Sequence, residues 1–593
     1  AGKGACRELT ELTGATASTF SRLEKLGLIT IWEQEVQPEL LSPAQEAAEP
    51  PVLNDEQQAA FDGLCLQMQS QKPGAALLYG VTGSGKTAVY IRLIYEALKA
   101  GKSAILLVPE ISLTPQLLEK LSAHFGQAVA VLHSSLRISE RFAQWRRIQS
   151  GQARVVVGTR SAVFAPVQSP GLFILDEEQE HTYKSENSPR YHAREIARYR
   201  GAKAGALVLL GSATPLVESM YRAKCGDYCL YTLKKRYNEK TLPQTQIVDL
   251  KQEIRQGNAT AISLPLEEKL RDNIIAGRQS ILFLNRRGNS RYLVCVECGD
   301  VPTCPRCSVH LTYHSVNQRL VCHYCGYTEP ARARCEKCGG ALKPIGSGTQ
   351  KIEQELRWIF PDTPLLRMDA DTVTARGSHE LLLRRFETEK IPILLGTQMV
   401  SKGLDFENVT LVGVLDADMS LYVSNYRAAE TTFSLITQVV GRSGRAKDPG
   451  FAIIQTTDPD NPVLNLAAAQ DYDAFFEQEI AYRKLGLYPP FCGLCVIGFA
   501  GAKEIETARA AARFAALLGQ LAAKQPDLPL RVLGPTPSSI EKINDTYRYK
   551  LTIKCRNDRR FRDLVRSALE LYEQEKLPSK ATVAVDLHSD GDI

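Results

Sequence analysis

The chain has 593 residues, of which 44% are hydrophobic and 23% are charged, and its 72 Lys and Arg residues against 66 Asp and Glu residues give a formal charge of +6. This length is too great for one hydrophobic core and predicts several domains. No run of about 18 apolar residues occurs, so no membrane span is expected, and the opening AGKGACREL has no apolar leader that would indicate a signal peptide. The weak positive charge permits binding to nucleic acid without favouring it.

Residues 8–35 have the pattern of a small helical module followed by a strand. Thr16 or Ser18 would cap its second helix, Gly27 would end that helix, and the alternating LITIWEQEV would form the strand. This order is typical of the end of a winged helix, which contacts DNA in some proteins and serves as a spacer in others. The sequence leaves both interpretations open. A linker rich in Pro, Ala and Glu closes this first unit near residue 50.

Short apolar runs that alternate with helical segments begin after this linker. AALLYG, SAILLVP, ARVVVGT, GLFILDEE and ALVLLGSATP form one set, and QSILFLNRRG, PILLGTQ, VTLVGVLDAD and GFAIIQTTD form a second set. Continuous apolar runs suit strands that are buried on both faces of a parallel sheet. We therefore predict an α/β fold with two doubly wound lobes. A strand RYKLTIKC and an amphipathic helix RFRDLVRSALELYEQE are predicted in a C-terminal α+β segment.

GVTGSGKT lies between a predicted strand and a predicted helix, which is the setting of a phosphate-binding loop. Gly80, Gly83 and Gly85 let backbone N–H groups close around phosphate oxygens. Lys86 would neutralise the β- and γ-phosphates of ATP, and the Thr87 hydroxyl would hold Mg²⁺. A chance occurrence of the pattern is the alternative, which the strand–loop–helix setting disfavours.

LFILDEEQ predicts a hydrophobic strand that ends in consecutive carboxylates. Asp176 can bind Mg²⁺, and Glu177 can orient and deprotonate the attacking water. The alternative is a strand end with solvated acids. Because a phosphate loop precedes this segment, we expect the catalytic role.

QVVGRSGR places Arg442 and Arg445 three residues apart, on one face of a helix. Such a pair could reach the γ-phosphate from the second lobe and stabilise the charge that develops in the transition state, as an arginine finger does. A basic helix cap is the alternative interpretation.

Eight of the fifteen cysteines form four Cys-x-x-Cys pairs between Cys295 and Cys338. Beside ATP motifs, this pattern favours metal in a reducing compartment over disulfides. Zinc takes four thiolates in a tetrahedron, so four pairs predict two closed, structural zinc sites. We favour a nested arrangement, with sequential pairing as the alternative. The inner site would use Cys304, Cys307, Cys322 and Cys325, and the outer site would use Cys295, Cys298, Cys335 and Cys338. Cys492 and Cys495 have no partner pair and are interpreted as core or turn cysteines.

The motifs follow the order found in superfamily 2 helicases. They are LNDEQ, GVTGSGKT, VPEISLTPQ, GTRSA, DEEQ, GSATP, GTQMVSKGLDF and QVVGRSGR. With LNRRG, GSGTQKIEQEL, VLDADMSL and the eight cysteines, they resemble the PriA family of bacterial primosomal helicases from about residue 8 to the C-terminus. The resemblance implies two RecA-like lobes, a winged-helix remnant, an inserted double-zinc region and a C-terminal domain. It also implies a 3′-end-binding domain ahead of the winged helix, so we expect an N-terminally shortened form.

The resemblance further implies a cytoplasmic, ATP-dependent 3′→5′ DNA helicase that restarts stalled replication forks. Its cofactors would be ATP, Mg²⁺ and two structural Zn²⁺ ions. Its partners would be forked and single-stranded DNA, other primosome proteins and the single-stranded-DNA-binding protein, and we expect a monomer without membrane contact. Gln179 stands where the family has His in DEEH. Because Gln can hydrogen-bond without titrating, we expect function to survive.

Further site residues follow from the same resemblance. On the nucleotide side these are Gln57 of LNDEQ and Asp405 of KGLDF. Donors to DNA phosphates are implied in VPEISLTPQ, GTRSA and GTQMVSKG, namely Thr114, Thr159, Arg160 and Lys402. QEHTYKSENSPRYHAR, which we call the aromatic loop (residues 179–194), resembles a DNA-sensing loop because aromatic faces stack on bases and basic groups hold phosphate. Its predicted contacts are Tyr183, Lys184, Arg190 and Arg194. An exposed loop of similar composition is the alternative.

These assignments predict the following division of the chain: a winged-helix remnant and linker (1–50), helicase lobe 1 (51–234), the start of lobe 2 (235–292), the cysteine-rich insert (293–345), the rest of lobe 2 (346–460) and a C-terminal DNA- and partner-binding domain (461–593). Two other functions are considered. A translocase that moves on duplex DNA does not fit the double-zinc insert well. A scaffold that uses ATP only as a switch is disfavoured by intact Lys86, Glu177 and Arg445.

Overall fold

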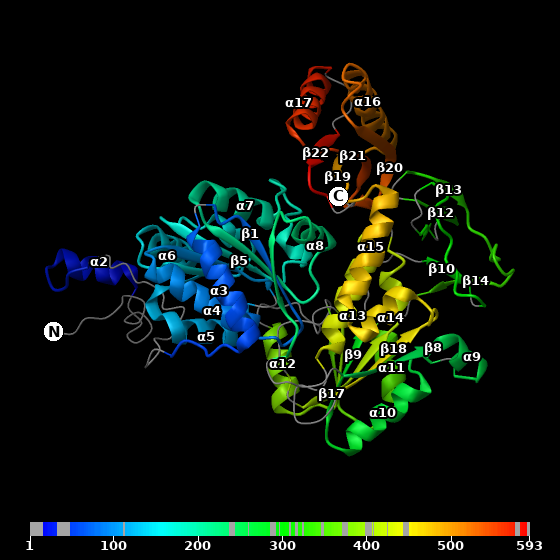
Figure 1. Ribbon diagram of the computed structural model, residues 1–593, viewed down its shortest axis with the longest axis horizontal. Helices are drawn as coiled ribbons and strands as arrows, with labels where there is room; N and C mark the ends of the chain where they lie inside the picture. Colours follow the sequence, from blue (N-terminus) through cyan, green and yellow to red (C-terminus); the bar gives the residue numbers. More distant parts are fainter. Residues whose placement is uncertain are drawn as a thin grey trace.

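The structure, a computed structural model, shows two α/β lobes side by side with a separate C-terminal domain standing above them (Figure 1). It describes residues 16–31, 48–70, 72–110, 113–236, 243–258, 260–284, 292–295, 297–306, 310–314, 318–322, 325–345, 349–369, 378–397, 406, 408–423, 425–442, 450–575 and 581–589. None of the helices in these ranges is both long enough and apolar enough to cross a membrane. Helix α2 (Ala17–Lys25) lies apart from the lobes at the N-terminal end, with Thr16 at its N-cap and Gly27 in the left-handed conformation just after it.

Lobe 1 contains a seven-stranded parallel sheet in the order β3-β4-β2-β5-β6-β1-β7. The five apolar runs predicted as strands are confirmed, and β3 and β7 are added to them. The strands are β1 (Ala75–Gly80), β2 (Ser103–Leu107), β3 (Val129–Leu132), β4 (Val155–Gly158), β5 (Pro170–Asp176), β6 (Leu207–Ser212) and β7 (Cys229–Leu233). Most of their side chains are buried because helices cover both faces of the sheet. The helices are α3 (Asp55–Gln69), α4 (Lys86–Lys99), α5 (Pro115–Phe125), α6 (Ile138–Gln149), α7 (Ala193–Ala204) and α8 (Val217–Lys224), with short 3₁₀ turns η2 (Gly126–Ala128), η3 (Arg160–Phe164) and η4 (His181–Tyr183).

Lobe 2 contains a six-stranded parallel sheet in the order β15-β16-β9-β17-β18-β8. The four predicted strands are confirmed, and β8 and β15 are added to them. The strands are β8 (Gln244–Asp249), β9 (Gln279–Leu284), β15 (Leu365–Met368), β16 (Ile393–Gly396), β17 (Val409–Leu415) and β18 (Phe451–Thr456). The helices are α9 (Leu250–Arg255), α10 (Leu264–Ile275), α11 (Thr349–Ile359), α12 (Ser378–Thr388), α13 (Ala428–Val440), α14 (Pro462–Ala469) and α15 (Tyr472–Gly486), with the 3₁₀ turn η5 (Ala417–Ser420).

Helices α14 and α15 pack against the two lobes. The Phe475 ring stacks on Phe433 of α13, with ring centroids 4.3 Å apart. The Tyr472 ring lies 5.2 Å from the ring of Tyr79, at the end of β1, and its hydroxyl donates to the Pro215 carbonyl at 2.7 Å. The sequence prediction began the C-terminal domain at residue 461, whereas these contacts join α14 and α15 to both lobes.

The cysteine-rich insert connects β9 to α11 through short antiparallel strands. Strand β10 (Tyr292–Cys295) pairs with β14 (Leu342–Ile345), and β11 (Thr312–His314), β12 (Arg319–Val321) and β13 (Thr328–Pro330) form a three-stranded sheet. The hairpin predicted between the inner cysteine pairs is confirmed as β11 and β12. Figure 1 places the insert on the outer side of lobe 2.

The C-terminal domain is a four-stranded antiparallel sheet in the order β20-β21-β19-β22, covered by two helices. Its elements are β19 (Gly493–Gly501), α16 (Glu504–Ala523), β20 (Leu530–Ile543), β21 (Thr546–Cys555), α17 (Arg559–Gln574) and β22 (Thr582–Asp586). The predicted strand and the predicted amphipathic helix are confirmed as β21 and α17. Cys495 is a buried core residue of this domain, as predicted.

Candidate active site and zinc clusters

The phosphate loop joins β1 to α4 at the carboxyl edge of the lobe 1 sheet. Gly83 (φ 80°) and Gly85 (φ 77°) adopt left-handed conformations that side-chain-bearing residues avoid. The Lys86 ammonium donates to the Gly80 carbonyl at 2.9 Å, which holds the side chain across the loop. A Cβ atom at Gly80 would lie 2.6 Å from the Ser84 hydroxyl, so this position has no room for a side chain. The loop therefore has the shape and the donors that a nucleotide phosphate needs.

Gln57 supports this loop from α3. Its backbone N–H and side-chain oxygen form a capping box with Asn54 at 2.9 and 3.0 Å. Its amide nitrogen donates to the Ser84 carbonyl at 2.8 Å. The structure thus places this predicted nucleotide residue beneath the loop, where its side chain is fully buried.

Asp176 and Glu177 follow β5 at the same edge of the sheet. The Tyr90 hydroxyl of α4 donates to Asp176 Oδ1 at 2.9 Å. Burial, with the Glu177 carboxylate beside it, raises the pKa of Asp176 to about 6, although Lys86 and Tyr90 act in the opposite direction. A carboxylate oxygen from Asp176 and a hydroxyl from Thr87, in the first turn of α4, are ligands that suit Mg²⁺.

Gln179 connects Glu177 to the next motif and then to lobe 2. Its amide nitrogen donates to Glu177 Oε2 at 2.6 Å, and its amide oxygen accepts from the Ser212 hydroxyl at 2.5 Å. Ser212 Oγ accepts from the Thr214 backbone N–H at 2.9 Å, and the Thr214 hydroxyl lies 2.7 Å from that of Ser434 in α13. The hydrogen bonding expected of Gln179 is therefore present, and it reaches across the two lobes.

The C-terminal end of α13 lies against the nucleotide site. The Gln438 amide donates to Glu177 Oε2 at 3.5 Å. A Cβ atom at Gly441 would lie 3.3 Å from the Cβ atom of Thr82 in the phosphate loop, which shows how closely the two segments approach. Arg442 follows Gly441 directly, so the structure brings this predicted arginine to the site. The predicted residues Arg445, Lys402 and Asp405 lie outside the described residues.

A buried cluster of charged residues, which the sequence did not predict, joins the two lobes next to the GSATP segment (residues 211–215). Arg427 contacts Glu218 at 2.6 Å and Glu430 at 2.9 Å, and the fully buried Arg483 contacts Glu479 at 2.8 Å and Glu430 at 3.0 Å. Burial opposes ionisation of Glu218, but Arg427 and Arg483 lower its pKa to about 2. These residues come from α8, α13 and α15, so no local sequence pattern could have grouped them.

Three of the four residues predicted to contact DNA in the aromatic loop are engaged in protein contacts, and two of them, Tyr183 and Lys184, are buried. The Tyr183 side chain has no exposed surface, and the single proton of its hydroxyl lies between the carbonyls of Leu107 at 2.9 Å and Asp176 at 2.6 Å. Lys184 forms a buried ion pair with Asp586 of β22. Arg194 contacts Glu178 at 3.3 Å. Each of these side chains has a partner within the protein in this structure, and the assignment of these residues as DNA contacts stays a prediction.

The other predicted DNA residues have different surroundings. Thr159 is only 4% exposed, and Thr114 caps α5 by accepting from the Leu117 N–H at 3.4 Å. The Arg160 guanidinium donates to the Thr182 carbonyl at 3.2 Å and thereby fixes the base of the aromatic loop. Arg190 is half-buried and lines a groove of 1880 Å³ between lobe 1, α13 and the C-terminal domain.

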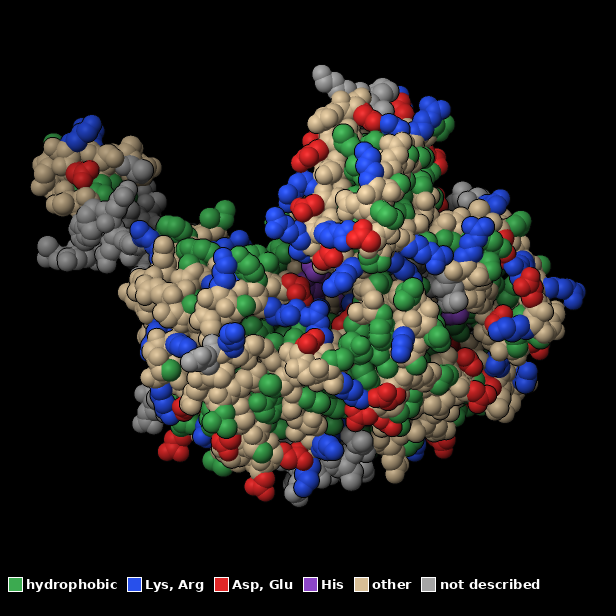
Figure 2. All heavy atoms as spheres, turned by 45° about the horizontal axis from the view of Figure 1, so that its top comes forward, with side chains coloured by type: hydrophobic (Ala, Val, Ile, Leu, Met, Phe, Trp, Pro, Cys, Tyr) green, Lys and Arg blue, Asp and Glu red, His purple; other side chains and the backbone are tan. Residues whose placement is uncertain are grey.

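Basic side chains of the C-terminal domain form one wall of this groove. They are Arg531, Arg548, Lys554, Arg556 and Arg562. Figure 2 shows Lys and Arg side chains gathered around the hollow at the foot of the upright domain. Among the basic residues of β20 and β21, Arg548 lines the groove, whereas Lys542 pairs with Asp545 at 2.7 Å and Lys550 is buried.

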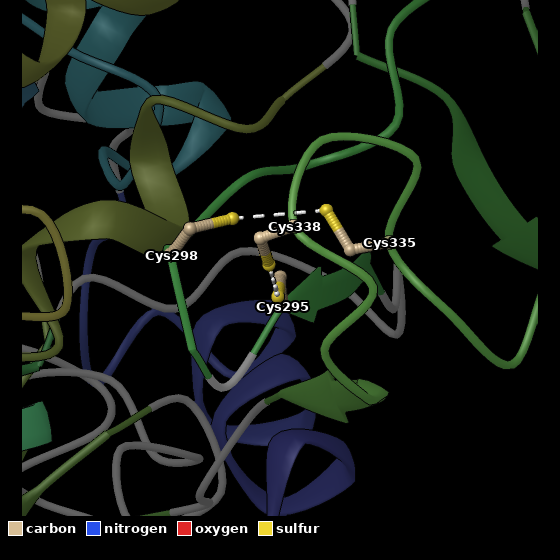
Figure 3. A group of neighbouring side chains, drawn as sticks. All are labelled: Cys295, Cys298, Cys335 and Cys338. Carbon is tan, nitrogen blue, oxygen red and sulfur yellow. Dashed lines mark hydrogen bonds between the residues drawn. The ribbon is translucent and has the colours of Figure 1, made fainter.

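The outer cysteines meet in one cluster, in which the thiols of Cys295, Cys298, Cys335 and Cys338 point toward one another (Figure 3). The Cys295 and Cys338 sulfurs are 3.4 Å apart, and those of Cys298 and Cys335 are 3.7 Å apart. Four sulfurs around Zn²⁺ at about 2.3 Å would lie about 3.8 Å from one another, so the donors fit this metal. The nested arrangement predicted for the outer pairs is confirmed.

A second cluster contains Cys304, Cys322 and Cys325. The sulfurs of Cys304 and Cys325 are 3.6 Å apart, which again suits a zinc site. Cys307, the predicted fourth ligand, lies outside the described residues. The three described thiols agree with nested pairing and not with sequential pairing, which would have joined the first two Cys-x-x-Cys turns.

The sequence matches four family models in the order of these structural units. They are DEAD/DEAH box helicase (residues 42–222), PriA DNA helicase Cys-rich region (CRR) domain (304–330), Helicase conserved C-terminal domain (350–447) and Primosomal protein N C-terminal domain (484–589). The structure of RecG bound to a three-way DNA junction aligns with 73% of this chain and 47% of its own, at 17% identity and a TM-score of 0.46.

Two curated relatives align over most of the chain. Replication restart protein PriA of Bacillus subtilis (strain 168) is 42% identical over 98% of this chain and 72% of its own length. Replication restart protein PriA of Chlamydia pneumoniae is 41% identical over 92% of this chain and 73% of its own length. On the strength of these two alignments and of the matching Cys-rich and C-terminal domains, the chain belongs to the PriA family of replication restart proteins.

Proposed function

We propose that this member of the family is an ATP-dependent DNA helicase that moves 3′→5′ and acts in replication restart. The observation that carries the proposal is the meeting of the two lobes at the nucleotide site, where Gln438 of α13 contacts Glu177 and Gly441 approaches Thr82. A nucleotide bound there would touch both lobes, so its hydrolysis would change their relation.

In this proposal each residue at the site has one task. Lys86 leaves the Gly80 carbonyl for the β- and γ-phosphates, and Thr87 and Asp176 would hold Mg²⁺, which would neutralise phosphate charge. Glu177 orients the attacking water and accepts its proton. Arg442, with Arg445, stabilises the charge that develops on the γ-phosphate from the lobe 2 side. Tyr90 keeps the Asp176 carboxylate oriented.

We propose that DNA follows the basic groove and the exposed part of the aromatic loop. Arg190 and the basic wall of the C-terminal domain would contact phosphates. Thr114, Thr159 and Arg160, which the helicase motifs imply as further contacts, would bind the strand outside this groove. Such contacts position a strand without reading its sequence. Tyr183, Lys184 and Arg194 are not included, because each has a partner within the protein, although Lys184 and Arg194 also line the groove.

Both zinc sites would be structural, since four thiolates leave no coordination position open for catalysis. The insert has few large apolar side chains, so metal binding would supply folding free energy that its core lacks. We also propose the domain boundaries predicted from the sequence, except that helices α14 and α15 are assigned to the lobes and not to the C-terminal domain. A monomer that works in the reducing cytoplasm with other primosome proteins would suit these thiolate sites.

Strand displacement on a forked DNA tests the proposal, with ATP turnover recorded in the same samples. Lys86→Ala should abolish both activities, because the ammonium is the cation of the phosphate loop. Lys99→Ala is the matched control, since Lys99 lies on the same helix but pairs only with Glu96 at the surface. Displacement in the parent and in Lys99→Ala, but not in Lys86→Ala, would support a helicase.

Other outcomes of this experiment would point elsewhere. Turnover without displacement would indicate a translocase, and DNA binding without turnover would indicate a scaffold. A zinc-site variant, Cys304→Ala with Cys322→Ala, should keep ATP turnover while losing displacement. Full displacement by that variant would show that the insert has no part in unwinding.

A further inference from the structure

One ion pair links the C-terminal domain to the loop that follows the catalytic carboxylates. Lys184 lies in the aromatic loop of lobe 1, and Asp586 is the last residue of β22. The side chains are 9% and 5% exposed, so the contact is shielded from water. Asp586 Oδ1 also accepts the His588 backbone N–H at 3.1 Å, which fixes the carboxylate.

The burial of this pair makes the contact sensitive to the loss of either partner. A buried charge is costly to desolvate, and removing one partner leaves the other uncompensated, at a typical cost of about 3–5 kcal/mol. Loss of either partner alone therefore leaves one uncompensated charge at the contact between the two domains. Surface pairs such as Arg513–Glu575 carry no such constraint, because water replaces the lost partner.

A short hydrogen-bonded segment runs from Lys184 back to Glu177. The Lys184 N–H donates to the His181 carbonyl at 2.9 Å, and the Tyr183 N–H donates to the Glu180 carbonyl at 3.2 Å. The Glu180 N–H donates to the Glu177 carbonyl at 2.9 Å. Consecutive turns of this kind move as one unit, so a shift of Lys184 is transmitted to the backbone of Glu177.

Tyr183 connects the same segment to Asp176. Its hydroxyl donates to the Asp176 carbonyl at 2.6 Å, on the residue whose carboxylate is oriented by Tyr90. The Glu177 backbone has a φ of 47°, which is unfavourable for a side-chain-bearing residue and needs surrounding contacts to hold it. The turn anchored by Lys184 supplies such contacts directly after this residue.

We propose that Lys184 and Asp586 are positioning residues for ATP hydrolysis. Through this ion pair the C-terminal domain holds the turn at residues 177–184 and thereby sets the orientation of Asp176 and Glu177. The inference deepens the proposed ATPase function and rests on it. It assigns the C-terminal domain a part in the nucleotide reaction, in addition to any contact with DNA. It also gives Lys184 a role inside the protein, whereas the sequence had suggested a contact with DNA.

The test compares four variants of the full chain with the parent. They are Asp586→Asn, Lys184→Met, the double variant with both changes, and Glu575→Gln as a control in the same domain. Hydrogen exchange of the amides at residues 177–192 is measured without nucleotide, and ATP turnover is measured as a function of Mg²⁺ concentration. Exchange does not depend on activity, so it tests the link even in a chain that does not hydrolyse ATP.

We expect faster exchange at residues 177–192 in Asp586→Asn, in Lys184→Met and in the double variant, because the turn loses its attachment to the C-terminal domain. The Mg²⁺ concentration for half-maximal turnover should rise about 10-fold, as is usual when a residue that orients a metal ligand is lost. Glu575→Gln should match the parent in both measurements.

The double variant separates positioning from a simple cost of burial. It leaves no unpaired charge, so its stability should recover, whereas its exchange and Mg²⁺ dependence should remain changed. Parent-like exchange and Mg²⁺ dependence in the double variant would overturn the proposal. An inactive parent would refute the proposed function, and its exchange data would still show whether the ion pair holds the turn.

Discussion

The phosphate loop and the aromatic loop lie in the same lobe, and both lie beside Asp176. Their side chains differ in whether they are available to a ligand. In the phosphate loop, Lys86 is half-buried and its ammonium donates to the Gly80 backbone carbonyl, a contact that it can exchange for a phosphate oxygen. In the aromatic loop, Tyr183, Lys184 and Arg194 are engaged by buried partners of the protein itself.

This difference shows which sequence patterns determine where a side chain lies in the fold. GVTGSGKT requires left-handed glycines between a strand and a helix, and that backbone brings Lys86 to one place. A mixture of aromatic and basic residues imposes no backbone, so its members can serve as internal braces as readily as ligand contacts. Four predictions test this difference between the two loops.

The largest effect is expected at the catalytic carboxylate. Glu177→Gln should lower ATP turnover about 10²- to 10⁴-fold, because an amide cannot accept the proton of the attacking water. Binding of a fluorescent ADP analogue should stay within a few-fold of the parent, since Glu177 does not support the phosphate loop. Substantial turnover in this variant would remove Glu177 from the reaction.

Arg194→Met should destabilise lobe 1 by about 3–5 kcal/mol, because it leaves the buried Glu178 carboxylate unpaired. Urea unfolding followed by circular dichroism measures this change. The control is Arg198→Met on the same helix, whose half-exposed ion pair with Glu195 should contribute less than about 1 kcal/mol. Normal stability with weakened DNA binding in Arg194→Met would show instead that the aromatic loop is a DNA site.

A smaller effect concerns the stability of the metal-free protein as pH changes. The folded-state pKa of Asp176 is raised above 3.8 to about 6, so its contribution to stability is fully present below pH about 4 and is lost as pH rises through about 6. Relative to Asp176→Asn, the parent should lose about 3 kcal/mol over this range. Urea midpoints in Mg²⁺-free buffer at pH 4, 5, 6 and 7.5 measure the difference, and a difference independent of pH would contradict it.

The smallest effect is expected at the exposed part of the aromatic loop. Arg190→Ala should weaken binding of single-stranded DNA several-fold and lower the slope of log affinity against log salt by about 0.7, the value for one phosphate contact. Stability should not change, because Arg190 is only half-buried. An unchanged salt slope would place the DNA path away from the aromatic loop.

Much of the fold could be predicted because fully buried strands leave a continuous apolar signature. All nine runs predicted as strands of the two lobes are present, and β3, β7, β8 and β15 were missed because they are short or carry polar residues. The outer cysteine cluster could also be predicted, since two Cys-x-x-Cys turns supply the four ligands of one tetrahedral ion.

The contacts between distant segments could not be predicted. Lys184 and Asp586 are 402 positions apart, and no spacing rule relates them. The same holds for Arg427 and Arg483, whose acidic partners come from separate helices. Periodicity reports which face of an element is buried, but the identity of the partner is decided by how domains meet.

The side-chain amide of Gln179 can connect Glu177 to Ser212 in one orientation of the amide. Its donor end faces Glu177 and its acceptor end faces Ser212, so both ends are matched in one orientation only. Turning the amide over would set two acceptors against each other at Glu177. Glu177 and Ser212 therefore constrain each other's geometry through Gln179. Because the Gln179 amide carries no charge and does not titrate, its own protonation does not change with pH over the physiological range.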